Sequence, residues 1–254
     1  MNFSEIYHAN KERVVTGLVM LAVASGVAMW NNLYVTWGIL GVAYLFAFHE
    51  AMKLFEVDDV KLYVYAVLVW VVALFYPYPD DLAYFVLLAS VAMMAYRKEM
   101  NYKLLAPLFY PTISMLFLFS LYSEFGMSSL VWLVIVVAMT DTAAYFVGKS
   151  IGKTPFSPTS PNKTLEGVLG GIVIATIAGA LYGTFLVPLW LSALIAFVTS
   201  VASVFGDLFE SFLKREAGVK DSGTLFPGHG GMLDRLDGYL FGVIIMVTLL
   251  RGLA

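Results

Sequence analysis

The chain has 254 residues, of which 60% are hydrophobic and 13% are charged, and its formal net charge is −3. Soluble domains are about half apolar and about a quarter charged, so this composition excludes an ordinary soluble protein and predicts an integral membrane protein. The absence of cysteine excludes disulfides and thiolate metal sites. No small-residue cleavage site follows the first apolar run, so no cleavable signal peptide is expected.

Apolar runs recur along the whole chain and are separated by short breaks with turn residues. A helix that crosses about 30 Å of hydrocarbon needs about 20 apolar residues. The runs lack the two-residue alternation of a membrane β-barrel. We therefore expect an all-α polytopic membrane protein with nine transmembrane helices, at roughly 14–30, 33–55, 60–77, 81–96, 104–122, 127–148, 166–186, 188–213 and 238–253.

The positive charges give an independent indication of the topology. When the breaks are numbered alternately, fourteen of the 15 Lys and Arg residues, Lys11 and Arg13 among them, fall on the N-terminal side, and only Arg251 falls on the other side. Cytoplasmic loops carry an excess of Lys and Arg. We therefore expect a bacterial-type inner membrane protein with its N-terminus and active site facing the cytoplasm and its C-terminus outside.

Two long polar breaks divide the chain by function. Residues 1–103 are expected to be a scaffold of transmembrane helices. Residues 104–254 are expected to form the catalytic region, with cytoplasmic loops at 149–165 and 214–237. No internal repeat is evident, which argues against a transporter built from two inverted halves.

Acidic residues occur inside or beside the expected spans, where charge is costly and is usually kept for function. Asp207, Glu210 and Lys214 share one helix face because they are spaced at i, i+3 and i+7. Asp207 lies seven residues before Lys214, about 10 Å along the helix, and Asp141 lies at a similar depth before Lys149. A shared wet cavity or a shared cation would relieve the cost of both carboxylates.

Asp234 and Asp237 stand at i and i+3 where the last span begins. Together with Asp207 they form an expected cage of oxygen ligands, which hard cations such as Mg²⁺ prefer and bridge to substrate phosphates. The alternative interpretation is that Asp234 and Asp237 cap the helix and match its dipole.

Three other polar groups have both a functional and a purely structural interpretation. Gly-rich backbone around His229 can approach an anion closely, or form a simple interfacial turn. Lys163, beside a helix start, is a candidate phosphate ligand, although positive-inside lysines need no ligand. His49, Glu50 and Lys53 are interpreted as an interfacial cluster. A further group of acids is expected to be solvated: Glu12, Asp58, Asp59, Asp80, Asp81 and Glu124.

The segment from Ser211 to Asp237 resembles the signature of the CDP-diacylglycerol synthase family, also called phosphatidate cytidylyltransferases. The resemblance is carried by Ser211, Lys214, Arg215, Lys220, Asp221, His229, Gly230, Gly231, Asp234, Arg235 and Asp237. A second matching region comprises Asp141, Tyr145, Gly148, Ser160, Pro161, Lys163, Thr164, Glu166 and Gly167. Leu165 and Lys149 depart from the family pattern, where Trp and Arg are common.

The resemblance implies that CTP and phosphatidate react to give CDP-diacylglycerol and pyrophosphate. It also implies a Mg²⁺ site, with room for a monovalent cation such as K⁺, and a homodimer in the lipid bilayer; no nucleic-acid partner is expected. The metal ligands would be Asp207, Asp234 and Asp237, and these acids would act in catalysis with Lys214 and Arg235. The expected substrate-binding residues are Asp141, Ser160, Lys163, Arg215, Lys220, His229, Gly230 and Gly231.

Rival interpretations remain open from the sequence. The membrane acids are also consistent with a cation-coupled transporter or channel. A polyprenol kinase or a cytidylyltransferase for ether lipids would use similar groups. A structural membrane scaffold would leave the polar clustering unexplained. The sequence does not identify the acyl or alkyl character of the lipid, the residues that contact the base, the monovalent ion, the dimer interface or the source organism.

Overall fold

A computed structural model describes residues 3–98, 103 and 105–253, with side chains from residue 14 onward. Lys11 and Arg13, which entered the charge count above, therefore lie outside the described side chains. Most of the expected break between residues 97 and 103 also lies outside the described residues.

The described residues form a helical protein with one small hairpin. In chain order the elements are α1 (Phe3–Trp30), α2 (Leu33–Leu54), α3 (Val60–Phe75), the 3-10 helix η1 (Pro79–Asp81), α4 (Leu82–Arg97), α5 (Ala106–Phe109), α6 (Thr112–Phe125), α7 (Met127–Ile151), β1 (Pro155–Ser157), β2 (Ser160–Thr164), α8 (Leu165–Gly183), α9 (Leu189–Glu216) and α10 (Leu233–Leu253). The expected helical membrane fold is thus confirmed in its class.

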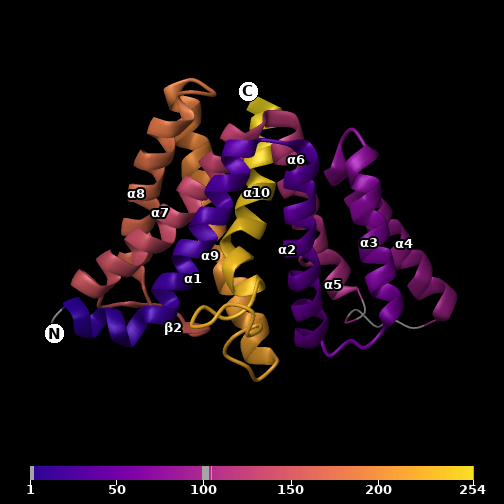
Figure 1. Cartoon of the computed structure of the whole chain (residues 1–254), viewed down its shortest axis with the longest axis horizontal. Helices are drawn as coiled ribbons and strands as arrows, with labels where there is room; N and C mark the ends of the chain where they lie inside the picture. Colours follow the sequence, from indigo (N-terminus) through magenta and orange to yellow (C-terminus); the bar gives the residue numbers. More distant parts are fainter. Residues whose placement is uncertain (1–2, 99–102, 104, 254) are drawn as a thin grey trace.

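The helices stand side by side with their polar connections gathered at one end. Helices α7 and α8 pack together, α8 packs on α9, and α9 packs on α10. Helices α2, α3 and α4 lie on the other side of α6 and α10, and α1 crosses the front obliquely (Figure 1). The β hairpin and the loop before α10 lie at the lower end in this view, and the C-terminus lies at the opposite end.

Seven of the described helical segments are long and apolar enough to cross a membrane by length and composition. They are Leu33–Leu54, Pro79–Arg97, Ala106–Phe125, Met127–Ile151, Leu165–Gly183, Leu189–Glu216 and Leu233–Leu253. Two further apolar helices, Val14–Trp30 and Val60–Phe75, are shorter. All nine expected positions are therefore helical, while the count of nine crossings and the orientation of the termini stay predictions.

The structure differs from the expected boundaries in three main places, the first of which is α10, since this helix begins at Leu233 and not near residue 238. The expected span 104–122 is interrupted between α5 and α6, where Pro111 has no backbone N–H and restricts the residue before it. The loop at 149–165 contains the antiparallel hairpin β1–β2, with Pro155 opposite Thr164 and Ser157 opposite Ser160. Pro158 and Thr159 make the turn between these strands, in keeping with the turn preference of proline.

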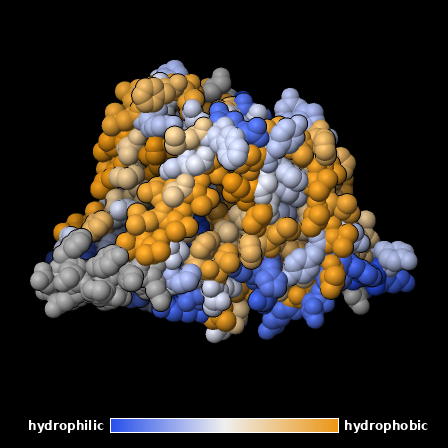
Figure 2. Space-filling model, viewed as in Figure 1, coloured by the Kyte–Doolittle hydropathy of each residue, from blue (hydrophilic) through white to orange (hydrophobic). Residues whose placement is uncertain are grey.

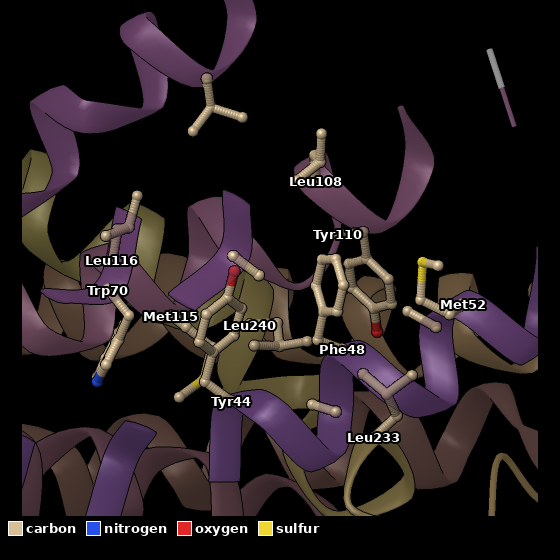
Figure 3. Close-up of a cluster of buried hydrophobic side chains, with 14 of the residues drawn as sticks. Tyr44, Phe48, Met52, Trp70, Leu108, Tyr110, Met115, Leu116, Leu233 and Leu240 are labelled. Carbon is tan, nitrogen blue, oxygen red and sulfur yellow. The ribbon is translucent and has the colours of Figure 1, made fainter. Parts of the chain in front are cut away.

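The buried apolar side chains form two clusters. One is centred on α2, α3 and α6 and includes Tyr44, Phe48 and Trp70, which Figure 3 draws together with Tyr110 and Leu240 of the same cluster. The other joins α7, α9 and α10 through Trp132, Ile195 and other buried side chains. The first cluster also contains Leu233 and Leu240, so α10 belongs to both cores and connects the two halves of the chain.

The outer surface has the polarity expected of a membrane protein. Many large apolar side chains on α1, α3, α4 and α8 are exposed. Figure 2 shows apolar residues over most of the visible height and hydrophilic residues along the lower edge, where the polar connections lie. This distribution places the polar loops at a membrane surface and the helix flanks against lipid.

A charged cluster fastens the C-terminal end of α10 to the N-terminal half. The Arg251 guanidinium donates two hydrogen bonds to Asp80, at 2.6 and 2.7 Å, and also pairs with Glu124. Asp80 is only 4% exposed and accepts a further bond from Ser120 at 2.6 Å. The expectation that Asp80 is solvated is therefore wrong, because this carboxylate is buried against a bidentate arginine.

Replacing Arg251 should destabilise the fold. Arg251→Gln leaves the buried Asp80 carboxylate with fewer donors, and an unsatisfied charged group of this kind costs about 2 kcal/mol. Thermal unfolding of the purified protein in detergent measures the loss. Arg97→Gln is the matched control, because Arg97 makes only a half-exposed pair with Asp59 at 3.9 Å, and such pairs contribute little. Equal stability of the two variants would contradict the prediction.

Candidate active site

Carboxylates from three helices converge near the polar end of the bundle. Asp207 and Glu210 lie on α9, Asp141 lies on α7 and Asp237 lies in the first turns of α10. The Asp237 carboxylate interacts electrostatically with all three of the others. Asp141 and Asp207 also interact with each other, as their similar depth predicts. Like charges at such a place are unfavourable unless cations or protons compensate them.

Lys163 supplies one of the compensating charges. It lies on β2 and forms an ion pair with Asp207 on α9, although 44 positions separate the two residues. Ser211, one turn further along α9, lies 3.4 Å from the other Asp207 oxygen. The hairpin thus brings a lysine to the acidic cluster, and the interpretation of Lys163 as a phosphate ligand stays a prediction.

Lys214 supplies a second charge and joins α9 to α10. Its ammonium pairs with Glu210 one turn earlier on the same helix and with Asp234, at 2.6 Å from the Asp234 oxygen. Glu210 is fully buried. Buried carboxylates of this kind depend on a close cation, because removing one partner leaves an uncompensated charge.

Asp234 anchors the loop between α9 and α10. Its Oδ2 accepts hydrogen bonds from the Ser222 amide and hydroxyl, both at 2.8 Å, and from the Gly231 amide at 2.7 Å. Its Oδ1 accepts from Lys214. Both oxygens therefore have protein donors, and Asp234 holds the loop in a defined conformation.

Close packing explains the glycines of this loop. Gly230 has φ +82° and stands against the Asp234 carboxylate, so a side chain there would be strained and would collide with it. His229 lies in the tight turn closed by the bridge between Phe226 and Gly230, and its Nδ1 is buried without a hydrogen-bond partner. The Gly231 amide, which the sequence offered as an anion donor, is engaged by Asp234.

The hairpin and the ends of α7 and α8 line a half-open pocket of about 190 Å³. Its lining includes Lys149, Asn162, Lys163 and Thr164, together with Tyr145, over whose ring the Lys149 ammonium lies at 5.7 Å. Glu166 fixes the hairpin by accepting bonds from the Lys153 and Thr154 amides. The pocket therefore presents two cations and an amide, and one of these cations, Lys163, also pairs with Asp207.

The structure does not bring the remaining predicted residues into direct contact with the acidic cluster. Arg215 is exposed and donates to the Val219 carbonyl at 3.0 Å, which closes the end of α9. Lys220 is exposed in the loop. Arg235 is exposed on α10 and interacts electrostatically with Asp141. Ser160 pairs with Ser157 in the hairpin. None of these four makes an ion pair with the acidic cluster within the described part of the chain.

The acidic side chains of the cluster are of the type that binds a hard divalent cation, although their arrangement does not form a complete metal site. Asp207, Glu210 and Asp237 offer the oxygen ligands that Mg²⁺ prefers. Both Glu210 oxygens are buried without a hydrogen-bond partner, although Lys214 lies beside the group. No three His, Asp or Glu side chains among the described residues are arranged to hold a metal ion together. The ligand set Asp207, Asp234 and Asp237 therefore stays a prediction.

Sequence reasoning missed three residues of this centre. Glu50 on α2 is buried and bonds to the loop at Ser222, Met232 and Leu233, so its interpretation as part of an interfacial cluster is wrong. Tyr110 is buried, its hydroxyl has no partner, and it interacts electrostatically with Glu210 and Asp237. An acid within an expected span was the signal available for Glu50; Ser222 and Tyr110 carried none.

Comparison with known proteins relates this chain to one protein family. A profile of the cytidylyltransferase family matches residues 11–253. A protein of Helicobacter pylori strain 26695 named phosphatidate cytidylyltransferase is 44% identical over 247 residues, which cover 94% of this chain and 91% of the relative. Proteins of the same name from Bacillus subtilis strain 168 and Brucella suis are 44% identical over 131 residues and 43% identical over 152 residues.

The B. subtilis match covers 50% of this chain and 49% of the relative, and the B. suis match covers 55% and 56%. The H. pylori match, in contrast, extends over both halves of the chain, including the helices that precede the acidic centre. The family expected from the signature between Ser211 and Asp237 is thereby confirmed. This chain belongs to the cytidylyltransferase family.

Proposed function

We propose that this chain transfers the cytidylyl group of CTP to phosphatidate, giving CDP-diacylglycerol and pyrophosphate for phospholipid synthesis. The observation that carries the proposal is the 44% identity, over 94% of the chain, to a protein named for this activity. The acidic centre with its two lysines lies at the polar end of a membrane helix bundle, where a lipid phosphate and a soluble nucleotide can meet.

The reaction exchanges one phosphoanhydride bond for another. An oxygen of the phosphatidate phosphate attacks the α-phosphorus of CTP, a new P–O–P bond forms, and the bond to the β-phosphate breaks. Pyrophosphate leaves with the electron pair of that bond. Since a phosphate monoester is mostly ionised near neutral pH, the nucleophile needs no strong base. Catalysis then rests on alignment and on neutralising negative charge.

The chain's own cations suit that task. Lys163 projects from the hairpin to Asp207 and lines the pocket with Lys149 and Asn162, so the pocket presents donors suited to phosphate oxygens. Lys214 lies between Glu210 and Asp234 and fixes the relation between α9 and α10. We assign Lys163 to substrate phosphate, with Arg235, Arg215 and Lys220 as exposed cations around it.

Mg²⁺ would be held by Asp207 and Asp237, with Asp234 or Glu210 completing the set, and when bound it would neutralise charge on the phosphates. A monovalent cation such as K⁺ beside it belongs to the same proposal. Binding of either ion would compensate the repulsion among these carboxylates, which the lysines meet only in part.

The proposed setting is the inner membrane, with the acidic centre on the cytoplasmic side. The excess of Lys and Arg at the polar end supports this orientation. CTP is soluble and reaches the centre from that side, whereas phosphatidate reaches it along the bilayer. The working unit is proposed to be a homodimer.

The direct test is pyrophosphate release by the purified protein with phosphatidate, CTP and Mg²⁺. We expect release with CTP and none with ATP, GTP or chelated metal. A parallel assay with an ether-linked phosphatidate and with a polyprenol identifies the lipid class. Phosphorylation of the polyprenol without pyrophosphate release, or cation flux in liposomes without either reaction, would overturn the proposal.

Asp207→Asn should lower the rate of cytidylyl transfer by about 100-fold or more, because it removes a carboxylate ligand of the proposed Mg²⁺ site, and the bound cation would stabilise the negative charge that develops on the phosphates. Mg²⁺ titration and thermal unfolding are measured on the same preparation, with Asp58→Asn as the control, since Asp58 is exposed. We expect a near-native melting temperature. A variant with wild-type turnover at limiting Mg²⁺ would remove Asp207 from the metal site.

Lys163→Gln should lower kcat/KM for CTP or phosphatidate by roughly 10- to 100-fold, since a charged donor to phosphate contributes about 1.5–3 kcal/mol. Separate titrations of the two substrates show which phosphate the lysine meets. The matched control is Lys153→Gln, because the Lys153 side chain is exposed in the same loop. If both variants behave alike, Lys163 has no special role in binding.

A further inference from the structure

Glu50 is a buried acid that connects the N-terminal helices to the loop of the proposed active site. It lies near the end of α2, is 5% exposed, and is more than 170 positions away from its hydrogen-bond partners. Burial of a carboxylate is unfavourable unless donors satisfy it. The partners of Glu50 therefore indicate what the residue is retained for.

The Glu50 carboxylate caps helix α10 from a distant part of the chain. Its Oε1 accepts the Met232 amide and its Oε2 accepts the Leu233 amide, each at 2.8 Å. The first amides of a helix have no partner within the helix, and its N-terminus attracts negative charge. Glu50 thus fixes the point at which α10 begins, one residue before Asp234.

Ser222 links Glu50 to Asp234. The Ser222 hydroxyl lies 2.9 Å from the Glu50 Oε2 and 2.8 Å from the Asp234 Oδ2, and it has one hydrogen to donate between them. The Ser222 amide donates only to Asp234. Glu50 and Asp234 therefore share the Ser222 hydroxyl, so a displacement of Glu50 would change the hydrogen bonding of Asp234.

The backbone of the loop packs closely against the Glu50 carboxylate at two glycines. A Cβ on Gly223 or on Gly231 would collide with the Glu50 carboxylate. Both ends of the loop segment from Ser222 to Met232 therefore close against one side chain of α2. The loop can keep this path only while Glu50 retains its place and its acceptor oxygens.

We propose that Glu50 is a positioning residue for cytidylyl transfer: it fixes the 222–233 loop and the start of α10, and thereby sets the position of Asp234. The inference rests on the proposed function, to which it adds a residue from the N-terminal half. Glu50 acts through Ser222 and the amides of α10 and touches neither substrate. A misplacement of about 1 Å at a reacting centre can cost about 100-fold in rate.

The test is Glu50→Gln, which keeps the size of the side chain but replaces one acceptor oxygen with a donor. The new amide group faces either the Met232 N–H or the Leu233 N–H, and the bond to that donor is lost. Amide hydrogen exchange followed by mass spectrometry reads the anchoring directly. We expect faster exchange in peptides covering 222–236 and unchanged exchange in α8.

Steady-state kinetics on the same preparations test whether Glu50 positions Asp234 for the reaction. We expect kcat to fall about 10-fold or more, as for other residues that orient catalytic groups, while KM for CTP stays within about twofold. The matched control is Glu56→Gln, since Glu56 is a glutamate close to Glu50 in the sequence that is exposed and pairs with Lys103. A general loss of stability would speed exchange in all helices and would leave kcat per folded molecule unchanged.

Ser222→Ala provides a second variant that keeps the charge of Glu50 and its two bonds to α10. It should also speed exchange around 222–223 and lower kcat. Native exchange in both variants would overturn the anchoring, and native kcat with faster exchange would overturn the positioning role. If the wild-type protein shows no cytidylyl transfer, the proposed function fails, and the exchange result still decides whether Glu50 holds the loop.

Discussion

The fold depends on compensating carboxylate charge at one end of an apolar helix bundle. Isolated charges near a bilayer are costly, so acids there require cations or hydrogen-bond donors. Lys163 and Lys214 meet this need for Asp207, Glu210 and Asp234. The Lys163–Asp207 pair joins β2 to α9 and the Lys214–Asp234 pair joins α9 to α10, whereas Lys214 and Glu210 pair within α9. The same contacts that make the acids tolerable therefore bring the hairpin, α9 and α10 together.

These pairs also connect stability with chemistry. Under the proposed function, a lysine that neutralises a carboxylate in the free protein would lie close to the substrate phosphates, and a divalent cation would compete for the same carboxylate oxygens. Asp237, which interacts with three other acids and pairs with no lysine in the described part of the chain, is the place where compensation is least complete. Attraction of a further cation follows from this imbalance.

The sequence predicted what local pattern determines and missed what distant pairing determines. Apolar runs located the helices, and the signature between Ser211 and Asp237 identified the family. Glu50 was interpreted as part of an interfacial cluster and Asp80 as a solvated acid, because nothing near either residue reveals a partner that lies more than 170 positions away. The break at Pro111 and the hairpin at 155–164 are local features, but they were not predicted from the sequence. The apolar content around Pro111 indicated one continuous span, and the lysines around the hairpin indicated only a cytoplasmic loop.

The two misread acids explain how the N-terminal half takes part in the site. Helix α10 carries Asp234 and Asp237 in its first turns, so its axial position sets theirs. Glu50 holds the start of α10 through its amides, and Asp80 holds its last turn through Arg251. Since both acids belong to the first 103 residues, that part of the chain does more than pack around the helices that carry the acidic cluster. It fixes α10 at both ends, and α9 is then aligned to α10 through Lys214.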